Sequence, residues 1–255
     1  HASEWLDVQH VGETLAKTRP RATAYIRPTA CMGRPLAQNH FIRYTEASWM
    51  HKRMIEVSRR FAAVERVLRN DGYKGLSKLT FPRRALYRGQ SATIYEQGGT
   101  IYRPEVRDGV YRNLIECESE THSLIRGDAP FLETSLRDLF GDFETSVLLR
   151  NPTLRLVLQP HAGGRLAAFE HTPSRTAFHN VMTRRAESWH DKLPQPAQLD
   201  GHTRACLHDR FLDPDAPISS WMDDSGERGN LLDQRYRMLG LDQVGRGADE
   251  RVVVA

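Results

Sequence analysis

The segment that follows Tyr44 carries the strongest periodic pattern in the chain. Its apolar residues recur at steps of four, three, four, three and four, at Met50, Met54, Val57, Phe61, Val64 and Leu68. This spacing predicts one buried face of a long α-helix. We expect Thr45 to cap its start and the turn at Asn70, Asp71 and Gly72 to end it. We expect the arginines on its other faces to be solvated: Arg53, Arg59, Arg60 and Arg66.

Composition limits the classes of protein that fit. The chain has 255 residues, of which 39% are hydrophobic and 27% charged, with a net charge of +4. This length allows one large domain or one domain with appendages. The arginines are spread along the chain, which argues against a dedicated nucleic-acid binder, and no apolar run reaches the length of a transmembrane helix. Three cysteines without paired spacing argue against a disulfide framework and a zinc site, so we expect a reducing compartment and no metal.

Further elements are expected to be mostly strands. A strand should cover 85–90 and deliver Arg88 at its end, with Gly89 allowing a bend or a close approach to a ligand. A helix over 110–124 should have an exposed acidic side formed by Glu116, Glu118 and Glu120. Strands are predicted at 130–136, at 153–160 and in the segment 247–255, which closes in a run of valines. Helices first and strands later indicate an α+β fold.

Three regions differ in character. Residues 1–40 have prolines and arginines without a helical period, which predicts a flexible or docked arm. Residues 41–255 are expected to form the folded domain. Within it, 184–247 is polar and rich in proline, glycine and aspartate, and we interpret it as a long insertion or loop region.

Four motifs occur in one order: Tyr44-Thr45, then Leu86-Tyr-Arg-Gly89, then Phe131-Leu-Glu-Thr-Ser-Leu136, then Leu154-Arg-Leu-Val-Leu158. This series resembles the arginine-specific mono-ADP-ribosyltransferases, including type III effectors of plant-pathogenic bacteria. The resemblance covers roughly residues 40–170. It implies a split β-sandwich core preceded by a helical lobe, and NAD as a substrate.

The resemblance also implies roles for single residues. Arg88 would hold the NAD phosphates, because a guanidinium pairs with phosphate oxygens through two hydrogen bonds, and Gly89 would let the dinucleotide lie against the backbone. Glu133, Thr134 and Ser135 match the Ser-Thr-Ser motif, with Glu133 in place of the first serine and Ser135 directed toward the catalytic acid. Arg155 falls where the family often has a supporting arginine. Its alternative is an ordinary exposed strand arginine.

The family's Glu-x-Glu motif is missing at its usual distance, where Phe178-His-Asn-Val-Met182 stands instead. Glu250, just before the valine run, is the best candidate for the essential acid, which would stabilise positive charge at the anomeric carbon. Asp249 is adjacent to it and would point to the other strand face. Glu116 and Glu118 have the right mutual spacing but precede the serine motif.

Several functions follow as expectations. The first is a monomeric secreted effector that transfers ADP-ribose from NAD to a host protein, within the host cytoplasm. The second is a catalytically degenerate module that binds a peptide or nucleotide in the same cleft. In either case the arm at residues 1–40 is a candidate pseudosubstrate that docks into its own cleft. Two weaker alternatives are an FRG-like domain, suggested by Tyr87-Arg-Gly-Gln-Ser91, and generic nucleic-acid binding.

Overall fold

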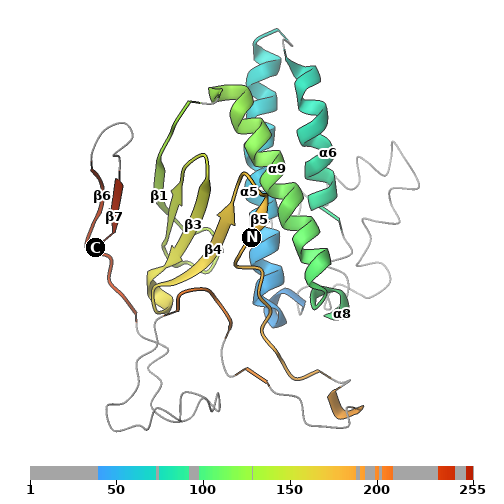
Figure 1. Cartoon of the computed structure of the whole chain (residues 1–255), viewed down its shortest axis with the longest axis vertical. Helices are drawn as coiled ribbons and strands as arrows, with labels where there is room; N and C mark the ends of the chain where they lie inside the picture. The colour runs from blue at the N-terminus through green and yellow to red at the C-terminus, as the bar shows by residue number, and fades with distance from the viewer. Residues whose placement is uncertain are drawn as a thin grey trace.

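Helices from the first half of the chain pack beside an antiparallel sheet from the second half, as the computed structural model shows (Figure 1). The structure describes residues 40–72, 75–91, 98–127, 129–187, 190–192, 199–200, 203–208, 235–244 and 251–254. The prediction of an α+β fold with helices first is confirmed. The predicted arm, apart from His40, and much of 184–247 lie outside the described residues.

Helix α5 covers Thr45–Asn70, as the apolar period predicted. Met50, Met54, Val57 and Phe61 are buried on its inner face. The prediction that Thr45 caps the helix is wrong. Tyr44 occupies the cap position without a side-chain cap bond, because Thr45 is already the first helical residue. The predicted end is confirmed, since Gly72 has a φ of 68°, the left-handed conformation that glycine adopts readily.

The strand predicted around Arg88 is wrong. A 3₁₀ turn, η1 (Leu76–Leu79), leads into helix α6 (Thr80–Gly89). The residues that α6 buries are Pro82, Ala85, Leu86 and Gly89. These positions lie three, four and seven residues after the first, which is one helical face. Pro82 is compatible with this helix because it stands in the first turn, where a backbone N–H has no partner within the helix.

A short helix, α8 (Gly98–Ile101), precedes the long helix α9 (Pro104–Arg126). The helix predicted over 110–124 is therefore confirmed. Its acidic side is not the solvated face that we predicted, because Glu116 and Glu118 are buried. Gly89 explains how α6 fits against α9: a Cβ atom at this position would lie 2.6 Å from Leu114 Cδ2.

The sheet has five strands in the order β1-β2-β3-β4-β5, and every neighbouring pair is antiparallel. The predicted strands at 130–136 and 153–160 are confirmed as β1 and β3. Strands β2, β4 and β5 were not predicted. The bounds are β1 Glu133–Arg137, β2 Ser146–Arg150, β3 Leu154–Gln159, β4 Arg165–His171 and β5 Thr176–Ala177. The turn between β3 and β4 contains η2 (Pro160–Ala162) and two glycines with positive φ, Gly163 and Gly164.

Two rows of side chains cross the face of the sheet that meets the helices. One row is apolar and aligns Leu148, Val157 and Ala168. The other is charged and aligns Glu133, Arg150, Arg155 and Glu170. The fold therefore places four ionisable side chains of neighbouring strands between the two layers.

A separate two-stranded hairpin joins β6 (Leu241–Val244) and β7 (Arg251–Val254), which confirms the predicted valine strand. A further 3₁₀ turn, η3, covers His190–Lys192. Within the described residues, no helix has both the length and the apolar character that crossing a membrane would require.

Candidate functional site

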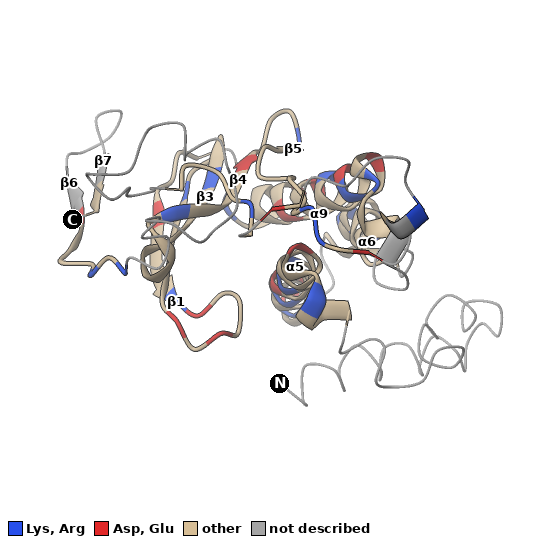
Figure 2. Ribbon diagram, turned by 90° about the horizontal axis from the view of Figure 1, so that it is seen from below, with Lys and Arg blue, Asp and Glu red and all other residues tan. Residues whose placement is uncertain are grey.

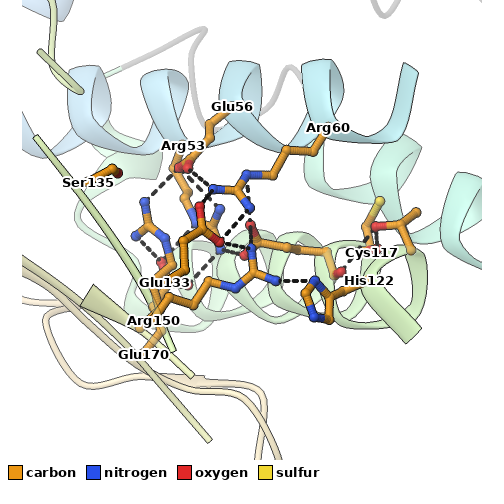
Figure 3. A network of polar contacts seen from close by, with 12 residues as sticks. Arg53, Glu56, Arg60, Cys117, His122, Glu133, Ser135, Arg150 and Glu170 are labelled. Atoms are coloured by element: carbon orange, nitrogen blue, oxygen red, sulfur yellow. Dashed lines mark hydrogen bonds and ion pairs between the residues drawn. The ribbon is translucent and has the colours of Figure 1, made fainter. Parts of the chain in front are cut away.

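Eight ionisable side chains meet between the helices and the sheet (Figure 3). We call them the charge cluster: Arg53, Glu56 and Arg60 of α5, Glu118 of α9, Glu133 of β1, Arg150 of β2, Arg155 of β3 and Glu170 of β4. Four arginines face four glutamates, so the cluster is electrically balanced. Ion pairs in such a place are retained only when the charges compensate one another, because taking each of them out of water is costly.

Arg53 lies at the centre of the cluster. Its Nε and Nη2 donate to the two carboxylate oxygens of Glu170 at 2.9 and 2.7 Å. Nη2 also donates to Glu118, and Nη1 donates to Glu56 at 3.3 Å. The prediction that Arg53 is a solvated charge is wrong, since it is only 6% exposed.

The arginines of the sheet complete the cluster. Arg155 donates to Glu56 at 2.6 Å and to Glu170 at 3.2 Å. Arg150 donates to Glu118 at 3.2 Å and to His122 Nδ1 at 2.8 Å. Arg60 reaches Glu133 at 3.1 Å from the more exposed rim. Each carboxylate of the charge cluster is thus held by at least two arginines.

The proton affinities of these acids follow from their partners. Burial alone would raise the pKa of Glu118, but Arg53, Arg150 and Arg60 outweigh it and lower that pKa well below its ordinary value. Burial would also raise the pKa of Glu170, but the charges of Arg53 and Arg155 outweigh burial, and the pKa of Glu170 is lowered. Both acids are therefore ionised at neutral pH and fixed in place, which suits an electrostatic scaffold.

A cavity of about 210 Å³ opens beside the Arg150 end of the cluster. One face of α9 forms a wall of it, and the other wall comes from the segments around β1, β2 and the β4–β5 turn. The lining residues that matter most are Glu118, Ser119, His122, Ser123, Phe131, Arg150, Asn151 and Thr172. The His122 ring packs against the Phe131 ring, with centroids 4.1 Å apart and an angle of 40° between the ring planes. Burial and the neighbouring Arg150 lower the pKa of His122, so its ring is neutral at neutral pH.

Metal chemistry finds no support in the part of the chain that the structure describes. No three His, Cys, Asp or Glu residues there are grouped as a metal ion would require. Cys117 is buried, and burial raises the pKa of its thiol to about 12, so it is not a nucleophile at neutral pH.

The residues proposed from the sequence lie in different parts of this fold. Arg88 and Gly89 belong to α6, which α9 separates from the sheet (Figures 1 and 2). Thr134 and Ser135 are on the edge strand β1, where Ser135 Oγ accepts a hydrogen bond from Arg137 at 3.0 Å. Arg155 is buried in the charge cluster, so its alternative as an exposed strand arginine is wrong. Glu250 lies outside the described residues.

The structure thus places Arg155 and Ser135 on the inner face of one sheet and leaves Arg88 in another layer. Sequence reasoning placed Glu118 on a solvated face and did not single out Glu56 or Glu170, although Glu118 and Glu170 are buried. One usable signal was the spacing of Glu118 from Ile115 and Leu114, since all three fall on the buried side of α9. Glu170 gave a weaker signal. It lies two residues after Ala168, so the two side chains share the inner face of β4.

Two family models match parts of this chain. Residues 36–121 match the family model described as alpha-amylase/4-alpha-glucanotransferase, middle domain, and residues 138–199 match the one described as alpha-amylase/4-alpha-glucanotransferase, C-terminal. The first match covers α5, α6, α8 and most of α9, and the second covers β2 to β5 of the sheet.

Particular relatives agree with these two matches. The chain is 26% identical to a 4-alpha-glucanotransferase of Thermococcus kodakarensis, with 72% of this chain and 29% of the relative aligned. It is 28% identical to an alpha-amylase of Pyrococcus horikoshii, over 72% of this chain and 27% of that protein. The crystal structure of 4-alpha-glucanotransferase from Thermococcus litoralis shares the fold, with a TM-score of 0.60 and 21% identity, over 85% of this chain and 32% of that one. The chain thus spans less than a third of the length of each of these proteins.

These matches correct the function expected from the sequence. The resemblance to mono-ADP-ribosyltransferases is wrong, and with it the split β-sandwich of that family, the transfer of ADP-ribose and the use of NAD. The four motifs that carried it are short, and the first two lie on helices that serve packing here. The predicted host protein partner, monomeric state and secretion into a host cell remain untested predictions.

Proposed function

We propose that this chain supplies the middle and C-terminal domains of an enzyme that acts on alpha-glucan. Its described part binds glucan and forms a rigid support, while the groups that break the glycosidic bond come from outside the described residues.

One observation carries the proposal: the two family models match in order, the first on the helices and the second on strands β2 to β5 of the sheet. The middle-domain match ends at residue 121, within α9, and the C-terminal match begins at residue 138, directly after β1. The charge cluster joins these two parts, because its members come from α5 and α9 on one side and β1 to β4 on the other. A joint of this kind fixes one domain relative to the other.

The electrostatics of the described acids support a binding role. Glycosidic bond cleavage commonly uses two carboxyl groups, one of which has a raised pKa and donates a proton to the leaving oxygen. Every described acid whose pKa departs from its ordinary value has that pKa lowered: Glu105, Glu118, Glu133, Asp138, Glu170, Glu187 and Asp200. None of these seven is prepared to act as the proton donor.

Affinity electrophoresis tests the binding role. The chain is run in native gels that contain amylose, hydroxyethyl cellulose or no polysaccharide, with serum albumin as a mobility marker. We expect amylose to retard the chain while hydroxyethyl cellulose leaves its mobility unchanged, because a glucan site distinguishes the shape of α-linked from β-linked chains. Equal mobility in all three gels would contradict the proposal.

A further inference from the structure

We propose that the cavity beside His122 and Arg150 is a binding site for one neutral pyranose ring, which the proposed function identifies as a glucosyl unit of alpha-glucan. This inference rests on the proposed function for the identity of the sugar. The cavity itself, its lining and its charge are properties of the structure and stand independently.

Size is the first argument. A cavity of about 210 Å³ has room for about seven water molecules at roughly 30 Å³ each, so it exceeds an ordinary buried-water site. It is smaller than the roughly 300 Å³ at which pockets for drug-sized ligands begin. A single six-membered ring with its hydroxyl groups falls between these limits, whereas an enclosed oligosaccharide does not.

The chemistry of the lining is the second argument. Ser119, Ser123, Asn151 and Thr172 offer hydroxyl and amide groups, and Ile115, Phe131 and Pro152 offer apolar surface. A pyranose has the same division, with hydroxyl groups around its edge and C–H groups on its faces. Ser119 and Ser123 are one helical turn apart on α9, so their hydroxyls lie on the same side of the cavity.

The charges that line the cavity favour a neutral sugar over charged small ligands. The two ionised side chains that line the cavity, Arg150 and Glu118, pair with each other at 3.2 Å. Arg150 is also engaged by His122, and burial lowers the pKa of His122, so the imidazole adds no positive charge. The carboxylate of Glu118 would repel a bound phosphate, and the guanidinium of Arg150 would repel a bound cation. A neutral, hydroxyl-rich ligand is repelled by neither side chain.

Hydrogen bonding fixes the polar groups before a ligand binds. A guanidinium only donates, so His122 Nδ1 accepts from Arg150 and the ring proton resides on Nε2. His122 Nε2 is buried and makes no hydrogen bond within the described residues. Asn151 Oδ1 accepts from the N–H groups of Thr153 and Leu154 at 2.8 and 2.7 Å. This fixes the orientation of the amide group of a residue that lines the cavity, and we assign its NH₂ group as a donor to the ligand.

Titration with methyl α-glucoside, followed by protein-detected NMR, tests the site. About thirteen non-hydrogen atoms at ordinary ligand efficiency give a dissociation constant of about 1 mM. Ser119→Leu puts a larger side chain into the cavity and is expected to weaken binding at least tenfold. Ser123→Leu serves as a second cavity-filling variant. The matched control is Arg112→Leu, an exposed position of the same helix outside the cavity, which should bind like the parent chain.

The outcomes separate this inference from the proposed function. Binding of the glucoside that Ser119→Leu and Ser123→Leu leave unchanged would overturn the site even if amylose still retards the chain. Inorganic phosphate that binds in place of the glucoside would also overturn it. If the parent chain binds the glucoside and both variants abolish that binding, the cavity is supported as the site. If amylose then fails to retard the chain, only the proposed function is contradicted.

Discussion

Arg53 on α5 and Glu170 on β4 form an ion pair through two hydrogen bonds, of 2.9 and 2.7 Å, although 117 positions separate them in the sequence. Both side chains are almost fully buried. Their geometry fixes the helix against the sheet, because a planar guanidinium and a carboxylate meet along two parallel bonds in one orientation only. The pair is the central connection of the charge cluster.

Replacing one partner of this pair should be severely destabilising. Arg53→Met leaves Glu118 and Glu170 buried with fewer compensating charges, and we expect a loss of about 3–5 kcal/mol in the free energy of unfolding. Urea denaturation followed by circular dichroism measures it. Arg66→Met, at an exposed position of the same helix, is the control and should change stability by less than about 0.5 kcal/mol. Equal effects of the two variants would show that the buried pair has no special role.

Two glycines on neighbouring helices should respond in opposite directions. A Cβ at Gly89 would lie 2.6 Å from Leu114 Cδ2, so Gly89→Ala forces the fully buried Leu114 side chain or the two helices to shift and should cost about 1–3 kcal/mol. At Gly109 on α9 no atom lies within 4 Å of such a Cβ, and Gly109→Ala should stabilise the helix by about 0.5–1 kcal/mol. Thermal unfolding measures both. A neutral Gly89→Ala would refute the close approach of the helices.

Stability should fall with acid in two stages. The folded state lowers the pKa of His122 and His179 below 6.5, chiefly by burial, so the unfolded chain binds their protons first and stability declines as the pH falls below about 6.5. Arginine neighbours lower the pKa of Glu118 and Glu170 below 4.5 despite burial, which adds a second decline below about 4.5. Melting temperatures between pH 8 and pH 3 should show both stages. Stability that rises between pH 6.5 and 5 would contradict the assignment.

Glu187 should hold the segment after β5 against the helices. Its Oε1 accepts hydrogen bonds from the phenols of Tyr44 and Tyr102, at 2.7 and 2.8 Å. Glu187→Gln weakens these bonds by about 1–2 kcal/mol in total, which corresponds to roughly 5- to 30-fold faster tryptic cleavage after Arg184 or Arg185. Mass spectrometry of the fragments measures the rate. Glu120→Gln on α9 is the control, and an equal rate in both variants would remove Glu187 from this role.

Local patterns predicted part of this fold correctly. Helix α5 and strand β3 followed from periodicity. The apolar residues of α5 repeat over enough positions to exclude a strand, and those of β3 repeat over enough positions to exclude a helix. The run Ala85-Leu86-Tyr87 is too short for that, and its helical state depends on packing against α9. Glycine after Arg88 is explained by the approach of Leu114, which no local pattern contains.

The site was beyond sequence reasoning for a related reason. An arginine such as Arg53 has the same local pattern whether it is solvated or paired, and its partners lie 65 and 117 positions away. The same holds for Glu118 and Arg150, whose contact depends on the sheet register. Charged residues close to the apolar face of a helix or strand were a weak local indication that these side chains are buried.

Product analysis of maltoheptaose incubated with this chain tests the central claim, which is that the described domains bind alpha-glucan but do not break its bonds. Mass spectrometry of the sugars is compared between the parent chain, a boiled sample and a commercial alpha-amylase as positive control. The account predicts that the chain leaves maltoheptaose intact under conditions in which amylose retards it in the gel. New shorter or longer maltooligosaccharides, formed by the parent chain and absent from the boiled sample, would contradict it.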